Sequence, residues 1–229
     1  MKTISTTLLA FLLLFTLPAA LADMYVDRSI VIFEAGGQPR EDVKVSNTGE
    51  EVMYIQVEVL EVKAPGSDAE ERIKAADPRE QKLIATPQKL VIQPGGQKLI
   101  RLVNLQKENQ TERIYRINVT PIVPPLEEET SQLRIVVAYQ ILTIIQPDEP
   151  VATLGASREG KQLKLSNSGN SNILLSEGKQ CDPADASICE DLPSRRLYAG
   201  NEWTLDLPWD GPAAYSVRTF DGIKKEIFP

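Results

Sequence analysis

The 229-residue chain contains two cysteines, Cys181 and Cys189, and no histidine. Without histidine, the sequence lacks the usual base of a Ser-His-Asp triad and one of the common zinc ligands. A catalytic thiol also needs an activating base, and two cysteines without other soft ligands make a poor metal site. The sequence has no glycine-rich phosphate-binding motif either. We therefore predict that the protein is not an enzyme and has no catalytic residues, no metal site and no cofactor.

Paired carboxylates are the one other route to hydrolysis, and the candidates are Glu127, Glu128 and Glu129. A general acid and its partner need a defined separation across the substrate, whereas consecutive glutamates are typical of a solvated loop. The formal net charge is −7, and no basic stripe is present. This composition disfavours nucleic-acid binding and mainly favours solubility.

The first 22 residues have the pattern of a secretory signal peptide. Lys2 is the positive charge, Leu8–Leu17 is an apolar segment too short to span a bilayer, and Ala20–Ala22 forms a small-residue cleavage site. We predict export, cleavage before Asp23 and no insertion in the membrane. Two nearby cysteines in an exported protein predict a Cys181–Cys189 disulfide, which would stabilise the fold by about 2–3 kcal/mol.

Short apolar runs separated by turn residues predict an all-β protein. We predict strands at Tyr25–Glu34, Asp42–Ser46, Val52–Val62, Leu83–Thr86, Lys89–Ile92, Gln97–Leu105, Arg113–Ile122, Val151–Leu154, Gln162–Ser166, Ile173–Ser176, Arg196–Tyr198, Trp203–Leu207, Ala214–Phe220 and Lys224–Phe228. Lys63–Glu80 is predicted to be a loop, and Gln93–Gly96 a type II turn. This spacing of strands and turns is typical of immunoglobulin-like β-sandwiches.

The segment Gln146–Pro150 is the strongest linker in the sequence, and it divides a first domain, residues 23–146, from a second, residues 147–229. A short internal echo supports two similar domains. Lys44–Gly49 (KVSNTG) matches Lys164–Gly169 (KLSNSG), and both are predicted to be a strand end followed by a turn. A match of six residues can also arise by chance.

The segment Ser131–Pro147 alternates as a β-strand does, with apolar residues on both faces. One face carries Leu133, Ile135, Val137, Tyr139 and Ile141. Such a strand is either a buried core strand or one whose face is completed by a partner.

Several motifs follow one another in a fixed order. They are Ile84-Ala85-Thr86-Pro87, Leu90, Pro94-Gly95, Ile100-Arg101-Leu102, Glu112, Tyr115-Arg116-Ile117-Asn118, Pro124-Pro125, the alternating residues Leu133, Ile135 and Val137, and Asp221-Gly222. With these motifs, the mature chain resembles the periplasmic chaperones of the bacterial chaperone–usher pathway of pilus assembly. The resemblance covers the whole mature length and is strongest in the first domain.

The resemblance implies two Ig-like domains in an L or boomerang arrangement, in a periplasmic protein whose partners are pilus subunits and an outer-membrane usher. It implies that the alternating strand, Leu133 to Ile141, completes the fold of a bound subunit by donor-strand complementation, a form of strand addition. An uncovered strand of this kind invites association, which favours a partner-capped state or a self-capped homo-oligomer.

The chain departs from the family pattern where the subunit's C-terminal carboxylate binds. The usual Arg and Lys of that anchor align with Ile30 and Leu142. Arginine can bind a carboxylate through two parallel hydrogen bonds. We expect Arg116 to replace the anchor, with Arg101 and then Arg28 as the alternatives. This departure indicates a divergent branch of the family, of the archaic or alternative kind.

The family also has an ion network between its domains. The resemblance assigns Glu112 and Asp221 as its acidic members, but its basic position aligns with Gln146, so that another arginine such as Arg218 would have to supply the charge. An alternative function remains, an exported Ig-like structural or carbohydrate-binding module in which Trp203 and Trp209 stack on sugars.

Overall fold

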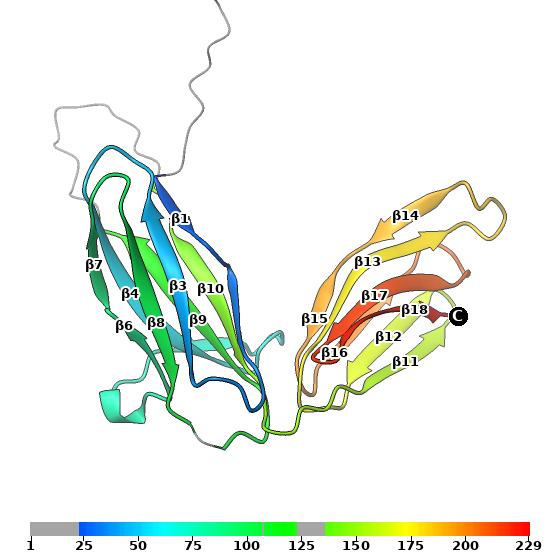
Figure 1. Cartoon of the computed structure of the whole chain (residues 1–229). Coiled ribbons are helices and arrows are strands. Elements are labelled where there is room, and N and C mark those ends of the chain that lie inside the picture. The colour runs from blue at the N-terminus through cyan, green and yellow to red at the C-terminus, as the bar shows by residue number, and fades with distance from the viewer. Residues whose placement is uncertain (1–22, 107, 123–135) are drawn as a thin grey trace, which may run out of the picture.

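The computed structural model describes residues 23–106, 108–122 and 136–229. These residues form two β-sandwiches that diverge from a narrow junction, giving the molecule the shape of an L (Figure 1). We call strands β1–β10 the first sandwich and strands β11–β18 the second sandwich. The prediction of an all-β fold with two Ig-like sandwiches in an L arrangement is confirmed.

The first sandwich packs a four-stranded sheet, in the order β1-β3-β8-β6, against a six-stranded sheet, β2-β10-β9-β4-β5, in which β7 also pairs with β4. Its elements are β1 (Met24–Val26), β2 (Ile30–Phe33), β3 (Arg40–Asn47), β4 (Met53–Lys63), β5 (Glu71–Ile73), the 3₁₀ turn η1 (Pro78–Glu80), β6 (Leu83–Thr86), β7 (Lys89–Ile92), β8 (Gln97–Asn104), β9 (Arg113–Pro121) and β10 (Tyr139–Ile145). Only the β2–β10 pair in this sandwich is parallel among the described strands.

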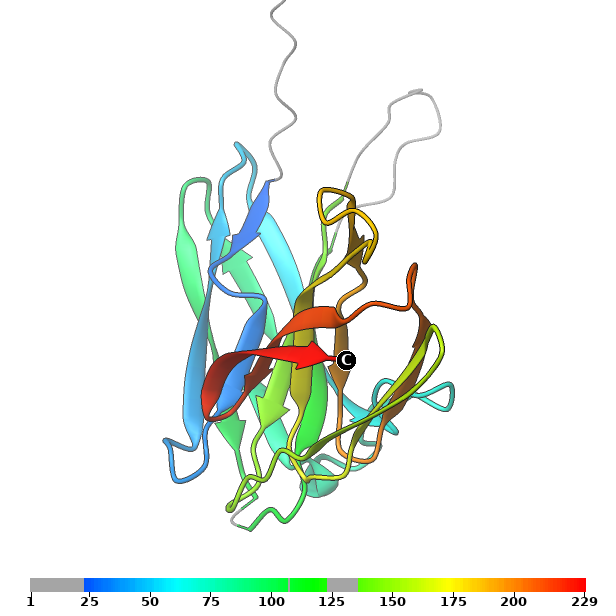
Figure 2. The same cartoon turned by 90° about the vertical axis from the view of Figure 1, so that its right-hand side faces the viewer.

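The second sandwich packs a three-stranded sheet, β11-β12-β16, against a five-stranded sheet, β14-β13-β17-β18, in which β15 also pairs with β13. Its strands are β11 (Leu154–Glu159), β12 (Gln162–Asn167), β13 (Ile173–Cys181), β14 (Cys189–Leu192), β15 (Arg195–Leu197), β16 (Glu202–Asp206), β17 (Ala213–Thr219) and β18 (Gly222–Phe228). In Figure 2, this sandwich lies in front of the first one.

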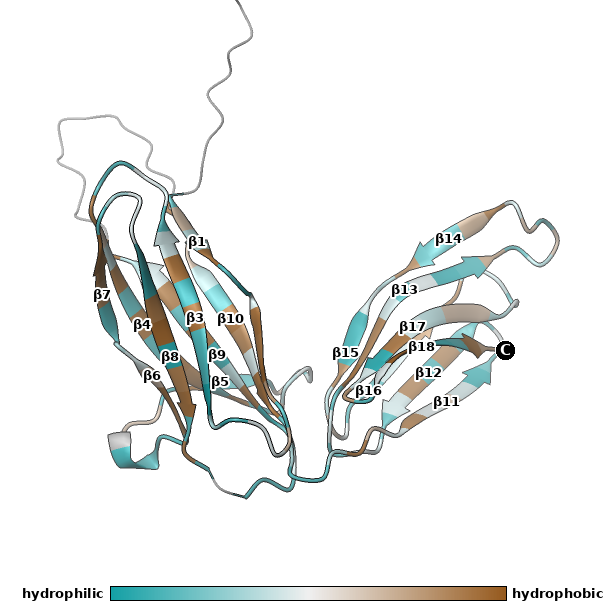
Figure 3. Ribbon diagram, in the orientation of Figure 1, coloured by the Kyte–Doolittle hydropathy of each residue, from teal (hydrophilic) through white to brown (hydrophobic). Residues whose placement is uncertain are grey.

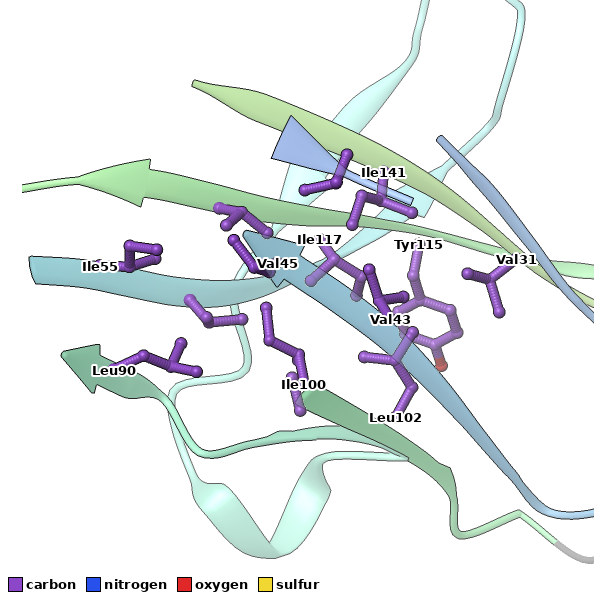
Figure 4. Close-up of a cluster of buried hydrophobic side chains, with 14 of the residues drawn as sticks. Val31, Val43, Val45, Ile55, Leu90, Ile100, Leu102, Tyr115, Ile117 and Ile141 are labelled. Atoms are coloured by element: carbon purple, nitrogen blue, oxygen red, sulfur yellow. The ribbon is translucent and has the colours of Figure 1, made fainter. Parts of the chain in front are cut away.

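Each sandwich has its own hydrophobic core. Along β3, β4 and β8, apolar and polar residues alternate, so that one face of each strand is buried (Figure 3). Figure 4 shows side chains of both sheets meeting in the first core, among them Val43, Ile100 and Ile117, which are fully buried. No helix among the described residues is long and apolar enough to cross a membrane.

The prediction of one strand over Tyr25–Glu34 is wrong, because the chain changes sheets within it. β1 pairs with β3 of one sheet, whereas β2 pairs with β10 of the other. The change occurs at Asp27, whose backbone N–H donates to the Lys44 carbonyl and whose carboxylate accepts from the Lys44 N–H. This pair of contacts anchors the bend that lets one segment serve both layers.

Three other local predictions differ from the structure. The predicted loop Lys63–Glu80 contains β5 and η1, and β14 was not predicted. The predicted strand Val151–Leu154 contributes only Leu154 to a strand, because the backbone of Val151 is held by Asn170 in a loop contact instead of a ladder. The type II turn at Gln93–Gly96 is confirmed, with a φ of 68° at Gly95 and a 2.9 Å hydrogen bond from the Gly96 N–H to the Gln93 carbonyl.

The repeated six-residue sequence contains a buried asparagine, Asn47 in the first sandwich and Asn167 in the second, whose side chain makes the same set of hydrogen bonds in both. Asn47 ends β3 and is only 1% exposed. Its amide NH₂ donates to the carbonyls of Glu51 and Ile92 at 2.7 and 3.1 Å, and its Oδ1 accepts from the Gly49 N–H at 3.0 Å. One buried side chain thus satisfies three backbone groups from two separate loops.

Asn167 repeats this arrangement at the end of β12 in the second sandwich, where it is also 1% exposed. Its NH₂ donates to the carbonyls of Ser171 and Leu197 at 2.8 and 3.0 Å, and its Oδ1 accepts from the Gly169 N–H at 3.0 Å. The predicted strand end and turn are confirmed in both copies. The matching six residues therefore encode the same local structure.

Candidate functional site

The candidate site is built around strand β10, the strand that contains the end of the predicted donor segment. Its residues Leu142–Ile145 lie between β2 and β9, whereas Tyr139–Ile141 pair only with β9 among the described strands. β9 continues to Pro121, beyond the residue that Tyr139 faces, Val119. The edge of Tyr139–Ile141 that points away from β9 is therefore an unpaired strand edge within the described part of the chain.

The face that is predicted to be donated to a subunit, Leu133, Ile135, Val137, Tyr139 and Ile141, divides into three parts. Leu133 and Ile135 lie outside the described residues. Val137 is half-buried and precedes the strand. Ile141 is 1% exposed in the core of its own sandwich, and Tyr139 packs against the same core and donates a 3.0 Å hydrogen bond to the Met24 carbonyl. The C-terminal end of this face is thus occupied by the first sandwich itself.

The outer face of this sheet is covered at its base by the second sandwich. Ile144, Ile114 and Val62 stand side by side on β10, β9 and β4, and Tyr198 of the second sandwich packs on them and on Leu142. Tyr198 is 7% exposed. We call these five residues the elbow cluster, because they join the two sandwiches.

Arg116, the predicted carboxylate anchor, lies on the same face of the sheet, two residues along β9 from Ile114. Leu142 is directly paired with Ile30 on β2 and with Arg116 on β9, so the three side chains are neighbours on one face. Ile30 and Leu142 are the two positions that the sequence resemblance aligns with the family's usual anchor. Arg116 is half-buried, and its Nε is buried without a hydrogen-bond partner among the described residues.

Arg101 and Arg28 lie elsewhere. Arg101 is on β8 in the opposite sheet, where it donates two 2.8 Å hydrogen bonds to the carboxylate of Asp42. These bonds hold the pKa of Asp42 below its ordinary value. Arg28, between β1 and β2, donates to Glu41 at 3.2 Å. Both guanidinium groups already have carboxylate partners, in contrast to that of Arg116.

Glu112 contacts the second sandwich at the junction. Its Oε2 accepts a 3.1 Å hydrogen bond from the Asn172 N–H and a second, short one from the Asn172 side chain, which also accepts from Arg196. Burial raises the pKa of Glu112, and the hydrogen bonds from Asn172 and the charge of Arg196 oppose that rise. The cation whose charge acts on Glu112 in this network is therefore Arg196, which no feature of the sequence indicated.

The other predicted member of the ion network, Asp221, lies in the turn between β17 and β18, where its N–H donates to the Thr219 hydroxyl. Gln146, at the aligned basic position, accepts a 3.1 Å hydrogen bond from the Ala35 N–H. The structure thus brings Glu112 together with Asn172 and Arg196, and it places Asp221 in a turn at the end of the five-stranded sheet's edge strand.

The predicted Cys181–Cys189 disulfide is confirmed. The two cysteines face each other across the β13–β14 pair, with their Cα atoms 4.0 Å apart. The bond closes the end of this hairpin, at a distance from the elbow cluster along β13 (Figure 1). It is a structural bond, and no free cysteine remains in the chain.

Comparison with known proteins agrees with this geometry. A family model described as pili and flagellar-assembly chaperone, PapD N-terminal domain, matches residues 23–150. The chain belongs to this family. The match includes all ten strands of the first sandwich and therefore the β2-β10-β9 surface that carries Arg116.

Two known proteins show how far the similarity of this pilus chaperone extends. A CFA/I fimbrial subunit of Escherichia coli is 28% identical over 196 residues, which cover 81% of this chain and 82% of the relative. The crystal structure of the class 5 fimbriae chaperone CfaA superimposes with a TM-score of 0.65 at 19% identity, and the match covers 90% of this chain and 99% of that one.

A third comparison is the Salmonella enterica SafA pilin in complex with the SafB chaperone, with a TM-score of 0.62 at 18% identity, covering 91% of this chain and 95% of that one. The similarity of fold to CfaA and SafB extends through both sandwiches. The pilus chaperone therefore shares its two-sandwich architecture with them, while its sequence has diverged widely.

Replacing Glu112 with glutamine tests its burial. Because the pKa of Glu112 is raised in the folded protein, the fold holds this proton more tightly than the unfolded chain does. The associated stability is present at low pH and is lost as the pH rises through the folded-state pKa. We expect the free energy of unfolding of the wild type, relative to Glu112→Gln, to fall as the pH rises from the ordinary value of 4.5. Urea denaturation at a series of pH values measures this difference.

The control is Glu159→Gln, which removes the same charge from an exposed position on β11. Its difference from the wild type should vary less with pH over the same range. If the profiles of the wild type and Glu112→Gln run parallel, burial does not govern the titration of this carboxyl.

Proposed function

We propose that this chaperone binds pilus subunits in the periplasm by donor-strand complementation and delivers them to an outer-membrane usher. The observation that carries this proposal is the half-paired β10. Its C-terminal half is fixed between β2 and β9, while Tyr139–Ile141 keep one backbone edge unpaired within the described residues. A partner that lacks a strand could pair with that edge through main-chain hydrogen bonds.

The side chains divide between two tasks in this proposal. Ile141 and Tyr139 remain with the core of the first sandwich, which fixes the strand's direction and register. Val137, together with Leu133 and Ile135 on the same face of the predicted strand, would enter the groove of the subunit. Each well-buried aliphatic side chain contributes about 1.5–3 kcal/mol.

We propose Arg116 as the anchor for the subunit's C-terminal carboxylate. It lies beside Leu142 and Ile30, its Nε lacks a partner, and Arg101 and Arg28 are engaged by Asp42 and Glu41. A guanidinium group that is half-buried beside aliphatic side chains binds a carboxylate more strongly than an exposed one, because solvent screens the pair less.

The domain and export assignments belong to the same proposal. Residues 1–22 would direct export and be removed, residues 23–146 would form the chaperone domain with the donor strand, and residues 147–229 would form the second domain. β10 ends at Ile145 and β11 begins at Leu154, which supports a boundary in the intervening segment. The pilin complex of the related SafB fold supports subunits as partners.

The alternative of a sugar-binding module finds little support in the positions of the tryptophans. Trp203 packs against the core of the second sandwich, edge-on to Tyr215, with the ring centres 6.2 Å apart. Trp209 follows β16 in a loop, where its carbonyl accepts hydrogen bonds from Arg158 and Gln180. One of the two rings is thus a partly buried core residue rather than part of an exposed stacking platform.

The test is co-expression of the full chain with a pilus subunit, followed by measurement of soluble complex in the periplasmic extract. We expect the double variant Ile135→Asp and Val137→Asp to yield no complex, because two carboxylates would have to be buried without partners in the subunit groove. The variant's own fold is checked by circular dichroism and by its unfolding transition.

The matched control places the same two charges on the other face of the segment, in the double variant Val136→Asp and Ala138→Asp. Both residues are exposed. We expect this control to retain most of the complex. Equal yields from the two double variants would overturn donation by the predicted face.

A further inference from the structure

The second sandwich carries two arginines on the outer face of its five-stranded sheet. On the outer face of its five-stranded sheet, Leu174 is directly opposite Arg196 on one side and Arg218 on the other. Ile223 on the edge strand β18 faces Arg218 and completes the row. In Figure 1, β15 and β13 form the side of this sandwich that lies nearest to the first one.

Within this row, Arg196 lies close enough to Arg116 of the first sandwich for the two charges to interact. Tyr198 and Ile114 both belong to the elbow cluster. Arg196 precedes Tyr198 by two residues, and Arg116 follows Ile114 by two residues. Side chains two apart on an extended segment share a face, so each arginine lies next to the elbow cluster, on the same face of its own sandwich as the cluster residue that it neighbours.

Three positive charges and two carboxylates, those of Glu112 and Glu70, act on one another in this region. Burial is the largest cause of the lowered pKa of Arg196; Tyr198 and Glu112 oppose this lowering, and the like charges of Arg218 and Arg116 add to it. Glu112 compensates part of the charge of Arg196, while its Oε2 accepts a hydrogen bond from the Asn172 N–H. Within the described residues, none of the three arginines lies within 4.0 Å of a carboxylate oxygen.

Glu70 also lies within range of Arg116, whose charge contributes least to the lowering of the Glu70 pKa. The main cause of that lowering is the hydrogen bond from the Gly66 N–H, and Arg72 also donates to the Glu70 carboxylate. Glu70 is therefore already engaged and leaves the positive charge of Arg116 largely uncompensated.

We propose that Arg116, Arg196 and Arg218 form one carboxylate-binding site that is shared between the two sandwiches. Its ligand is the C-terminal carboxylate of a bound subunit, and Ile30, Leu142 and Ile223 offer apolar surface to the residues that precede that carboxylate. The inference rests on the proposed function and adds to it that the second sandwich takes part in binding. A bound carboxylate then links the two sandwiches and holds the elbow in one arrangement.

The first test compares three variants of the full chain in their affinity for a co-purified pilus subunit. Arg218→Gln removes a charge from the second sandwich without touching the donor strand or the elbow cluster. We expect its dissociation constant to rise by at least about tenfold, as for the loss of a charged hydrogen bond, and that of Arg116→Gln to rise similarly. The control is Lys225→Gln, which removes the same charge from an exposed position on the same sheet, opposite Ser216 rather than in the row; it should bind as the wild type does.

The second test needs no subunit and uses inorganic sulfate as the probe. An anion that binds only the folded state raises the melting temperature, and it does so more when it binds more tightly. At matched ionic strength, we expect sulfate to raise the melting temperature of the wild type and of Lys225→Gln more than that of Arg116→Gln or Arg218→Gln. The general stabilising effect of sulfate is common to all four proteins.

The outcomes separate the two proposals. If the donor-strand variant and Arg116→Gln lose the subunit while Arg218→Gln and an Arg196→Gln variant bind normally, donation stands and the shared site is overturned. Equal sulfate responses in all four proteins would also overturn it. If the donor-strand variant itself keeps the subunit, the proposed function fails, whatever the arginine variants do.

Discussion

Replacement of Asn167 with alanine is expected to lower the free energy of unfolding of the second sandwich by about 3 kcal/mol, since buried groups that lose a partner cost about 1–3 kcal/mol each. The substitution removes the donors for the Ser171 and Leu197 carbonyls and the acceptor for the Gly169 N–H. Alanine cannot replace any of them. Asn47→Ala should have a similar cost in the first sandwich, where the same contacts recur.

The two tryptophans make this prediction easy to check, because Trp203 and Trp209 both lie in the second sandwich and the chain has no others. In urea, the fluorescence transition should move to lower concentration in Asn167→Ala and move far less in Asn47→Ala. Circular dichroism, which reports both sandwiches, should detect the loss in each variant. Asn118→Ala is the control, because its amide makes an exposed hydrogen bond with Gln140. A small effect of Asn167→Ala, equal to that of the control, would contradict the prediction.

These asparagines also show what the sequence could predict. The repeated Asn and Gly residues indicated a strand end and a turn in both halves, and the proline and glycine residues around Gln93–Gly96 marked a turn and the adjacent strand β7. Such features depend on local backbone preferences, which are readable from a few neighbouring residues. The third role of Asn47, its bond to Ile92, joins segments far apart in sequence and could not be read in the same way.

The division of Tyr25–Glu34 into β1 and β2 shows the limit of local patterns. The buried residues are Met24 and Val26 in β1 but Val31 and Phe33 in β2, so the alternation changes phase between the two parts; the apolar sequences MYV and IVIF do not reveal which residues are buried. What separates them is the pairing partner, β3 for one and β10 for the other. A change of sheet depends on the placement of distant strands, and two segments that are apolar throughout do not reveal it from their sequence.

The candidate site was predictable in part for the same reason. Resemblance and strand position pointed to Arg116, but only the register of β9, β10 and β2 places it beside Leu142 and Ile30. Arg196 and Tyr198 had no signal in the sequence, because their roles arise where two separately folded sandwiches meet. Contacts between domains follow from the relative placement of whole sheets, to which hydrophobic periodicity within one strand is insensitive.

The largest effect on the arrangement of the molecule is expected from Tyr198→Ala. Tyr198 packs on Val62, Ile114 and Ile144, and Gly66 approaches it so closely that a Cβ there would lie 2.9 Å from its ring. Loss of a buried aromatic side chain costs about 3–5 kcal/mol, and here the loss falls on the contact between the sandwiches. Each sandwich keeps its own core, so we expect both to remain folded while the elbow loosens.

Small-angle X-ray scattering should therefore show a larger radius of gyration and a broader distance distribution for Tyr198→Ala. The affinity for a pilus subunit should fall, because Arg116 would no longer be held near Arg196 and Arg218. The control, Tyr198→Phe, keeps the ring in the elbow cluster and removes only the hydroxyl, and it should scatter as the wild type does. The tryptophan fluorescence transition separates this result from simple unfolding, since it should move less in Tyr198→Ala than in Asn167→Ala. Unchanged scattering in Tyr198→Ala would show that the other junction contacts, such as those of Glu112 with Asn172, hold the sandwiches in place without the ring.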